Sequence, residues 1–187
     1  MQSWYEVAQG AELRQGSLLR AFPIAKPPKN ITKNKNGEYE PIMGKLSVED
    51  IVILSQSCDL AQNKSGLVLV APVMTLERLS QSLSKNITND EVHLSKFWEQ
   101  IRSGHQPPLH MLAACDIEAF QKDIEVVDFR QAITVSYAYI TRFAVEAGSH
   151  LRLAAPFREH LSQAYARFMM RVALEKEAEI PRFSPLP

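Results

Sequence analysis

Two short runs of β-branched and leucine side chains are the strongest feature in the hydrophobic pattern of this chain. They cover residues 50–55 and 67–73, and within them apolar residues follow one another without regular polar alternation. Continuous apolar runs of this length are typical of strands that are buried on both faces of a sheet. The segment 56–66 between them is polar and turn-prone, so we expect two central strands joined by an irregular loop.

Weaker strand patterns occur on both sides of this central pair. The stretches are 12–24, with a turn at Gly16, then 124–129, 132–140 and 151–153. The third stretch is ambiguous, because helical spacing begins within it and continues over 137–148. Asn36 and Gly37 tolerate positive φ and favour a tight hairpin turn, which predicts a protruding hairpin or loop within 26–45.

Three later segments carry apolar residues at helical spacing. The first contains Leu76, Leu79 and Leu83, and the second contains Leu94, Phe97, Trp98 and Ile101. Asn89 or Asp90 is suited to cap the second, and Gly104 stands where a helix-terminating glycine belongs. The third and longest follows Pro156 and contains Phe157, Leu161, Tyr165, Phe168 and Val172.

These elements predict a single α+β domain over 1–187. We expect a small, mostly antiparallel β-barrel or curled sheet built from 12–73 and 124–153. The C-terminal amphipathic helix at 157–179 would close it, and the helical insert at 76–103 would lie against one end. A chain of 187 residues is long enough to form a sizeable core.

Composition narrows the class of protein. The apolar share is 45% and the charged share 22%, which is ordinary for a globular chain and excludes a mostly disordered one. Lys plus Arg and Asp plus Glu both count 21, so no overall field favours nucleic acid or membranes, and only a local basic face remains open. With two cysteines and no secretory pattern at the start, we expect a cytoplasmic protein with reduced thiols.

The chain lacks the usual sequence motifs for binding several classes of ligand. No apolar run approaches the roughly 20 residues that span a bilayer, so we expect no membrane contact. The glycine-rich motifs that bind nucleotides are missing, as are the common metal motifs. We therefore predict no cofactor and no metal.

The first candidate binding site leaves the first buried strand and consists of Ser55, Gln56, Ser57, Cys58 and Asp59. A cysteine beside hydroxyls and a carboxylate can act as a nucleophile or a ligand, and a short helix capped by Ser57 would favour its thiolate. The histidines that could serve as its base are His93, His105 and His110. The structural alternative makes Cys58 a small buried residue, with the serine hydroxyls satisfying exposed backbone amides.

A zinc site is a further alternative. His105, His110 and Cys115 together with Cys58 would supply four ligands of the tetrahedral type. Their spacings of five residues are not typical of a zinc knuckle. His110 equally fits a hydrogen-bonded histidine in an apolar segment.

The C-terminal helix provides the remaining candidate residues. His160, Gln163, Arg167 and Arg171 fall within about 60° on a helical wheel, and Arg158 lies on the opposite flank of the apolar stripe. Guanidinium groups on such a face can hold phosphate oxygens. Alternatively, their stems cover the core while their heads stay in water or pair with glutamates. We predict that Arg158, Arg167 and Arg171 lie near Cys58 and His110 and form one binding face.

Two stretches, DIVILSQSCDLAQ and APFREHLSQAYARFMMRV, resemble the signatures of an uncharacterised prokaryotic family over about residues 18–172. More loosely, QGSLLR followed by DIVILSQSCD is similar to a pattern in MazF/PemK-type toxins, which are small SH3-like barrels that cleave RNA. That resemblance covers about the first 75 residues and implies an SH3-like barrel. Ser17 stands where those toxins commonly carry an acidic residue, so no catalytic residue is carried over.

Two functions from different classes follow. The first is a non-enzymatic binding or regulatory module of a bacterial defence or toxin–antitoxin system. Its partner would be a protein encoded nearby or a nucleic acid, and self-association is left open. The second is a MazF-like endoribonuclease, which needs an acid/base pair and a phosphate-holding arginine in one cleft.

Overall fold

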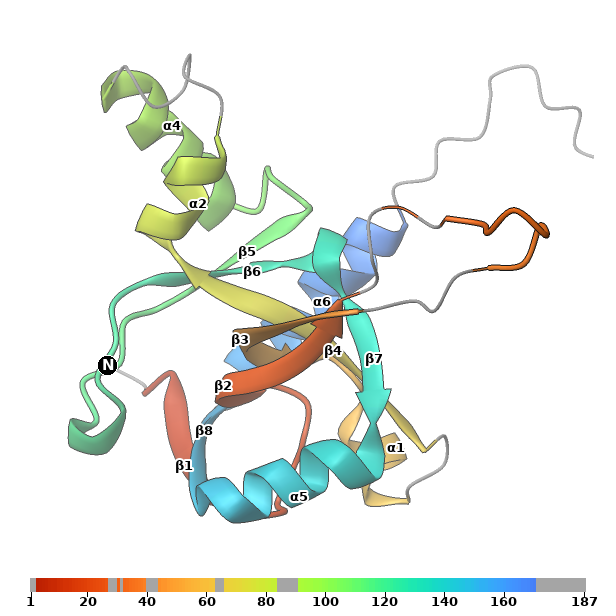
Figure 1. Ribbon diagram of the computed structural model, residues 1–187. Coiled ribbons are helices and arrows are strands. Elements are labelled where there is room, and N and C mark those ends of the chain that lie inside the picture. Colours follow the sequence, from red (N-terminus) through yellow and green to blue (C-terminus); the bar gives the residue numbers. More distant parts are fainter. Residues whose placement is uncertain are drawn as a thin grey trace, which may run out of the picture.

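The computed structural model describes residues 3–26, 30, 32–39, 44–62, 66–83 and 91–170 (Figure 1). The strands are β1 Tyr5–Gln9, β2 Ser17–Lys26, β3 Lys45–Ile53, β4 Leu67–Thr75, β5 Leu109–Leu112, β6 Glu125–Asp128, β7 Ile133–Ser136 and β8 Ser149–Leu153. The helices are α1 Ser57–Ala61, α2 Leu76–Ser82, α4 Glu91–Arg102, α5 Tyr137–Ala147 and α6 Phe157–Met169, with short 3-10 turns at Glu118–Phe120 and Phe129–Gln131. In these ranges no helix is both long enough and apolar enough to cross a membrane.

All eight strands belong to one antiparallel sheet, which confirms the α+β class. The order is β1-β8-β2-β3-β4-β6-β5, with β7 also paired to β4. The sheet does not close into a barrel, and β1 and β5 form its two ends. Of the two shapes expected, the barrel is therefore not formed, and the SH3-like barrel implied by the toxin resemblance is not present. One edge of β4 is shared between β7, which pairs at 67–70, and β6, which pairs at 73–75.

Helices α5 and α6 cover opposite faces of the central strands. Leu18 and Val52 point to the face covered by α6, where Leu161 is fully buried. Their neighbours along the strands, Leu19 and Ile51, point to the face covered by α5. Successive strand residues face opposite sides of a sheet, so the uninterrupted apolar runs are explained by helices on both faces.

Helices α2 and α4 form the predicted helical insert and pack on the β5–β6 end of the sheet (Figure 1). Leu79 of α2 and Ile101 of α4 share a buried cluster with Leu109 and Val126. This cluster holds the end of α4 next to β5. The expected cap at Asn89 or Asp90 lies outside the described residues.

The prediction of a strand over 132–140 is wrong for its second half. Strand β7 ends at Ser136, and α5 begins at Tyr137. Ile140 and Ala144, one helical turn apart, are both fully buried against the sheet. Packing of this helical face outweighs the β-branched composition of the segment.

Other local expectations are confirmed or refined. The turn at Asn36 and Gly37 is present, since the Asn34 N–H donates to the Glu38 carbonyl at 2.9 Å. The loop at 56–66 was expected to be irregular, but it contains the short helix α1. Strands β1 and β5 were not predicted; both are short and lie at the sheet ends.

The C-terminal helix packs as its apolar stripe predicted. Phe157, Leu161, Tyr165 and Phe168 all belong to or pack against one core cluster. Helix α6 ends at Met169, with Met170 as its C-cap, and Val172 and the predicted end at 179 lie outside the described residues.

Candidate functional site

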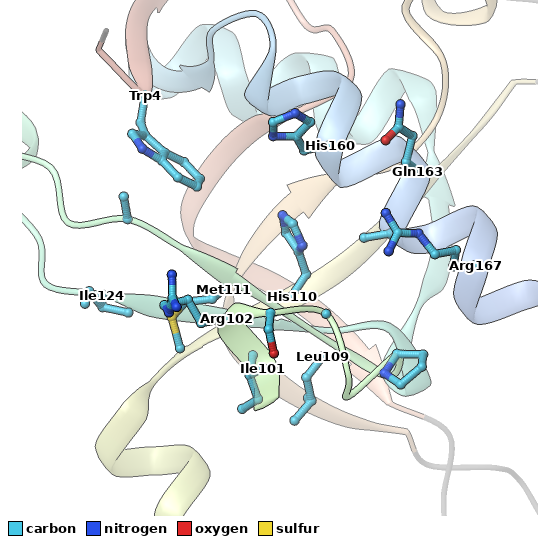
Figure 2. Close-up of a pocket in the computed structure, with 15 residues that line it drawn as sticks. Trp4, Ile101, Arg102, Leu109, His110, Met111, Ile124, His160, Gln163 and Arg167 are labelled. Carbon is cyan, nitrogen blue, oxygen red and sulfur yellow. The ribbon is translucent and has the colours of Figure 1, made fainter. Parts of the chain in front are cut away.

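A cavity of about 510 Å³ opens between β5, the end of α4 and α6 (Figure 2). We call it the His110 cleft. Its polar lining includes Arg102, His110, His160, Gln163 and Arg167, and its apolar walls include Trp4, Met111 and Ile124. The volume lies within the range of about 300–1,000 Å³ that is usual for small-molecule sites.

Helical spacing places three polar residues of α6 at the cleft. His160, Gln163 and Arg167 follow one another at i, i+3 and i+7 and therefore share one face. Leu161, on the adjacent face, is fully buried and fixes the rotation of the helix about its axis. In Figure 2 all three polar side chains lie on the α6 side of the cleft, opposite β5.

His110 extends from β5 into the centre of this group (Figure 2). Its ring lies over Phe129, with centroids 6.3 Å apart and an interplanar angle of 20°. Its Nε2 atom is buried and has no hydrogen-bond partner among the described residues. Burial, followed by the positive charges of His160 and Arg167, lowers the pKa of His110 to about 4. The imidazole is therefore neutral at pH 7.

Arg167 differs from Arg102, which also lines the cleft, and from Arg158 at the start of α6, because it has no ion pair within the described part of the chain. Arg102 pairs with Glu99 at 2.6 Å, and Arg158 pairs with Glu159 at the same distance. The Arg167 guanidinium reaches across to the turn after α4, where Nη1 lies 3.6 Å from the position that a Cβ on Gly104 would occupy.

Charge at the cleft is one-sided. The lining residues include two arginines and two histidines, but no aspartate or glutamate. Glu99 is not part of the lining but binds Arg102. Because His110 is neutral at pH 7 and Arg102 is paired, Arg167 is the guanidinium whose charge no carboxylate in the described residues compensates, although the whole chain has a net charge of zero.

An aromatic wall borders the cleft beside His160. Trp4 stacks on Phe157, with ring centroids 4.0 Å apart and an interplanar angle of 13°. Phe157 in turn meets His160 edge to face at 6.0 Å. Because Phe157 also packs against the core, the indole ring is held in one orientation while it lines the cleft.

A buried charge network anchors the far end of β5. The carbonyl of Ala113, a lining residue, accepts hydrogen bonds from Tyr5 Oη at 2.7 Å and Lys122 Nζ at 3.1 Å. Lys122 pairs with Glu125 at 2.9 Å, and Glu125 also pairs with Arg20 at 2.7 Å. Burial raises the pKa of the Glu125 carboxyl, but hydrogen bonds from Arg20 and Lys122 outweigh it and hold that pKa below its ordinary value.

The Ser55–Asp59 segment, in contrast, lies around α1. Ser57 does not cap α1; its hydroxyl instead accepts the Gln15 N–H at 3.2 Å. The Ser55 hydroxyl accepts the Leu69 N–H at 2.8 Å. Both serines thus satisfy backbone amides, as the structural alternative predicted.

Cys58 is exposed, so the interpretation of this residue as a buried apolar side chain is wrong. Its thiol lies 3.6 Å from Gln56 Oε1 and 3.7 Å from Asp59 Oδ1. No histidine is among these contacts. The base that covalent catalysis requires is therefore not provided within the described contacts of the thiol.

The structure divides the predicted binding face into two parts. Arg158 lies beside Gly16, with its Cγ atom 3.4 Å from the position of an added Cβ, and the neighbouring Gln15 binds the Ser57 hydroxyl. His110 and Arg167 are together in the His110 cleft, whose lining contains none of residues 55–59 and not Arg158. The nine-residue separation of the two arginines on α6 corresponds to about 14 Å along the helix axis. Arg171 lies outside the described residues.

The four candidate zinc ligands are not gathered at one point. No group of three or more histidine, cysteine or acidic residues in the described ranges is arranged to hold a metal ion. Cys58 is on α1, Cys115 is buried in a bridge to Lys122, and His105 Nδ1 lies 2.8 Å from the Ser103 hydroxyl.

Several residues of the cleft were not found by sequence reasoning, among them Trp4 and Arg102. Trp4 precedes β1 and belongs to no motif, and Arg102 was included only in a general helical pattern. A lone aromatic residue and a helix-terminal arginine are common in any sequence. Their sequence context therefore contained nothing that pointed to a site.

No protein family, no curated protein and no solved structure matches this chain. The function is therefore inferred from the cleft and from the physical properties of its residues.

Proposed function

We propose that this protein is a non-enzymatic binding module that holds an anionic group of a nucleic acid partner in the His110 cleft. The observation that carries the proposal is the absence of carboxylates from a lining in which Arg167 has no ion pair with any described residue. Phosphate groups supply most of the affinity in protein–nucleic acid complexes, and arginine is suited to bind them through two parallel hydrogen bonds.

The guanidinium of Arg167, unpaired among the described residues, supports this proposal further. A guanidinium that is already paired must lose that partner before it binds a ligand, whereas Arg167 has no such partner in the described chain. Its position at the mouth of a concave site also favours a ligand over solvent, because low-dielectric walls strengthen electrostatic attraction.

The second candidate function is a MazF-like endoribonuclease, since two histidines and an arginine border one cleft. The properties of His110 favour binding instead. A general base must be within hydrogen-bond reach of its substrate and works best with a pKa near the operating pH. His110 Nε2 is buried, and the pKa of His110 is about 4, so this imidazole is poorly suited to that role at neutral pH.

Fluorescence anisotropy with labelled single-stranded RNA and DNA of matched sequence tests the proposal. We expect binding that weakens with added salt, and about a tenfold loss of affinity in Arg167→Ala, because hydrogen bonds to charged groups contribute about 1.5–3 kcal/mol. Arg142→Ala is the matched control, since Arg142 is exposed on α5 and pairs with Glu146 away from the cleft. Equal binding by the wild type and Arg167→Ala would contradict the proposal.

Incubation with total RNA separates the two candidates. The binding module should leave RNA intact with and without a chelator. Specific cleavage that is lost in His160→Ala would replace the binding proposal with the endoribonuclease.

The biological setting is proposed from the looser resemblance of about the first 75 residues to MazF/PemK-type toxins. We propose that the module acts in a bacterial defence or toxin–antitoxin system, together with a protein encoded nearby. Co-purification of the module with the products of neighbouring genes tests this, and a protein that always purifies alone would contradict it.

A further inference from the structure

We propose that the His110 cleft is a pocket for a nucleoside monophosphate unit, with the phosphate at Arg167 and His160 and the base against Trp4. This inference rests on the proposed function and specifies the chemical class of the ligand. The unit can be a free nucleotide or the phosphorylated end of a single strand, and both present the same chemistry to the cleft.

The anionic part of the ligand is assigned by the α6 side of the cleft. His160 and Arg167 lie about two helical turns apart on one face, with Gln163 between them. The lining contains no carboxylate that would repel phosphate. Both side chains are exposed and extend to the cleft from α6, which Leu161 anchors in the core, so they can close on a phosphate without rearrangement of the core.

The planar part of the ligand is assigned by the Trp4 end of the cleft, which adjoins His160 and lies away from Arg167. One face of the Trp4 indole is covered by Phe157 at 4.0 Å, and the indole also lines the cavity. Met111 and Ile124 extend this apolar wall. Stacking of a base on an aromatic side chain stabilises the complex and tolerates any base. An apolar wall of this kind adds no affinity for inorganic phosphate, which has no apolar surface.

Gln163 supplies a polar group on the α6 side of the cleft. Its carboxamide offers both a donor and an acceptor, and it forms no hydrogen bond with any residue that the structure describes. Because it lies between His160 and Arg167, it is placed for the sugar hydroxyls next to the phosphate rather than for the base at Trp4. A nucleotide carries such hydroxyls, whereas the phenyl phosphate of a phosphotyrosine does not. The cleft thus combines a cation for phosphate, a ring for stacking and an amide for the sugar.

Intrinsic fluorescence of Trp4 offers a direct assay. The chain has two tryptophans, Trp4 and Trp98, so Trp98→Phe leaves Trp4 as the sole indole. This protein is titrated with AMP, CMP, GMP and UMP, with the corresponding nucleosides, and with inorganic phosphate, pyrophosphate and phosphotyrosine. We expect the monophosphates to change Trp4 fluorescence and to bind at least about tenfold more tightly than the nucleosides or phosphate alone.

Variants assign the two ends of the ligand separately. Arg167→Ala should weaken monophosphate binding at least about tenfold, whereas Arg142→Ala should leave it unchanged. Trp4→Leu keeps apolar volume beside Phe157 but removes the ring. Measured by calorimetry, it should weaken monophosphate binding and leave pyrophosphate binding unchanged. An unchanged melting temperature in each variant excludes misfolding as the cause.

Oligonucleotides distinguish the two sources of the unit. RNA with a 5′ phosphate, a 3′ phosphate or neither is compared with the mononucleotides by competition. Tighter binding of one phosphorylated end identifies a strand terminus as the ligand, whereas equal or weaker binding than the mononucleotide identifies a free nucleotide. Both outcomes support the pocket.

The failures of this inference and of the proposed function are distinguishable. Binding of pyrophosphate and RNA without any preference for nucleoside monophosphates would overturn the nucleotide pocket but leave the anion-binding module intact. Tighter binding of phosphotyrosine than of every monophosphate would also overturn it. A protein that binds no phosphate compound and no RNA would overturn both.

Discussion

Protonation of His110 should destabilise the fold, because its imidazole is largely buried and lies near two positive groups. Burial, followed by the charges of His160 and Arg167, lowers the pKa of His110 from 6.5 to about 4. In the unfolded chain the same imidazole titrates near its ordinary value of about 6.5. Between these two pH values the unfolded state therefore binds more protons than the folded state.

Proton linkage determines the sign and size of the effect. The free energy of unfolding falls as the pH drops from about 6.5 to about 4, and His110 adds no further change below its folded-state pKa. One pKa unit corresponds to about 1.4 kcal/mol, so the His110 contribution amounts to about 3 kcal/mol. That is a large part of the roughly 5–15 kcal/mol by which domains are usually stable.

Urea unfolding from pH 7 to pH 4 measures this contribution when the wild type is compared with His110→Gln. Other groups also titrate in this range, among them His150, whose pKa is lowered chiefly by burial. Their effects are shared by both proteins and cancel in the comparison. The wild type should lose up to about 3 kcal/mol more than His110→Gln.

His105→Gln provides the matched control, because His105 is exposed and lies in the same segment of the chain. Its pH dependence should follow that of the wild type. The reasoning is refuted if wild type and His110→Gln lose the same stability between pH 7 and pH 4, or if an NMR titration finds His110 protonating near pH 6.5.

Three further predictions concern the fold and the thiols. Leu161→Ala should lower the free energy of unfolding by about 2–5 kcal/mol in urea titrations, since Leu161 is fully buried on the side of α6 that faces the sheet. A loss below about 1 kcal/mol would contradict its core position. Gly16→Ala should cost more than about 1 kcal/mol, because Gly16 has φ 81° and an added Cβ would lie 3.0 Å from Leu153 Cβ. A neutral result in the same titration would argue against this turn. In the native protein Cys58 should react rapidly with a thiol reagent while Cys115 reacts only after unfolding, and two fast thiols would refute the burial of Cys115.

Most of the fold could be predicted because its determinants are local. The apolar runs at 50–55 and 67–73 are strands β3 and β4, and the helical stripe after Pro156 is α6. The error at 132–140 has a physical reason. A segment such as 137–148 carries both β-branched composition and helical spacing, and only packing of Ile140 against the sheet selects the helix.

The candidate site could be predicted in part. Helical spacing identified His160, Gln163 and Arg167 as one face, and the structure places that face at a cleft. The sequence predicted that the arginines of this helix would all lie near Cys58. They do not, because the direction of α6 across the sheet separates its first turn from its later turns. Arg158 thus lies near the Gln15–Gly16 turn, while Arg167 reaches the turn after α4.

The sequence by itself determined which segments are strands or helices and which side of each is apolar, since periodicity and local sterics act between near neighbours. Only the tertiary structure decided which polar residues share a site. Trp4, His110 and Arg167 are far apart along the chain and meet because β5 ends the sheet beside α4 while α6 crosses one face. The positive character of the cleft has the same origin: a neutral chain acquires it when folding places Arg167 beside Arg102 and leaves carboxylates out of the lining.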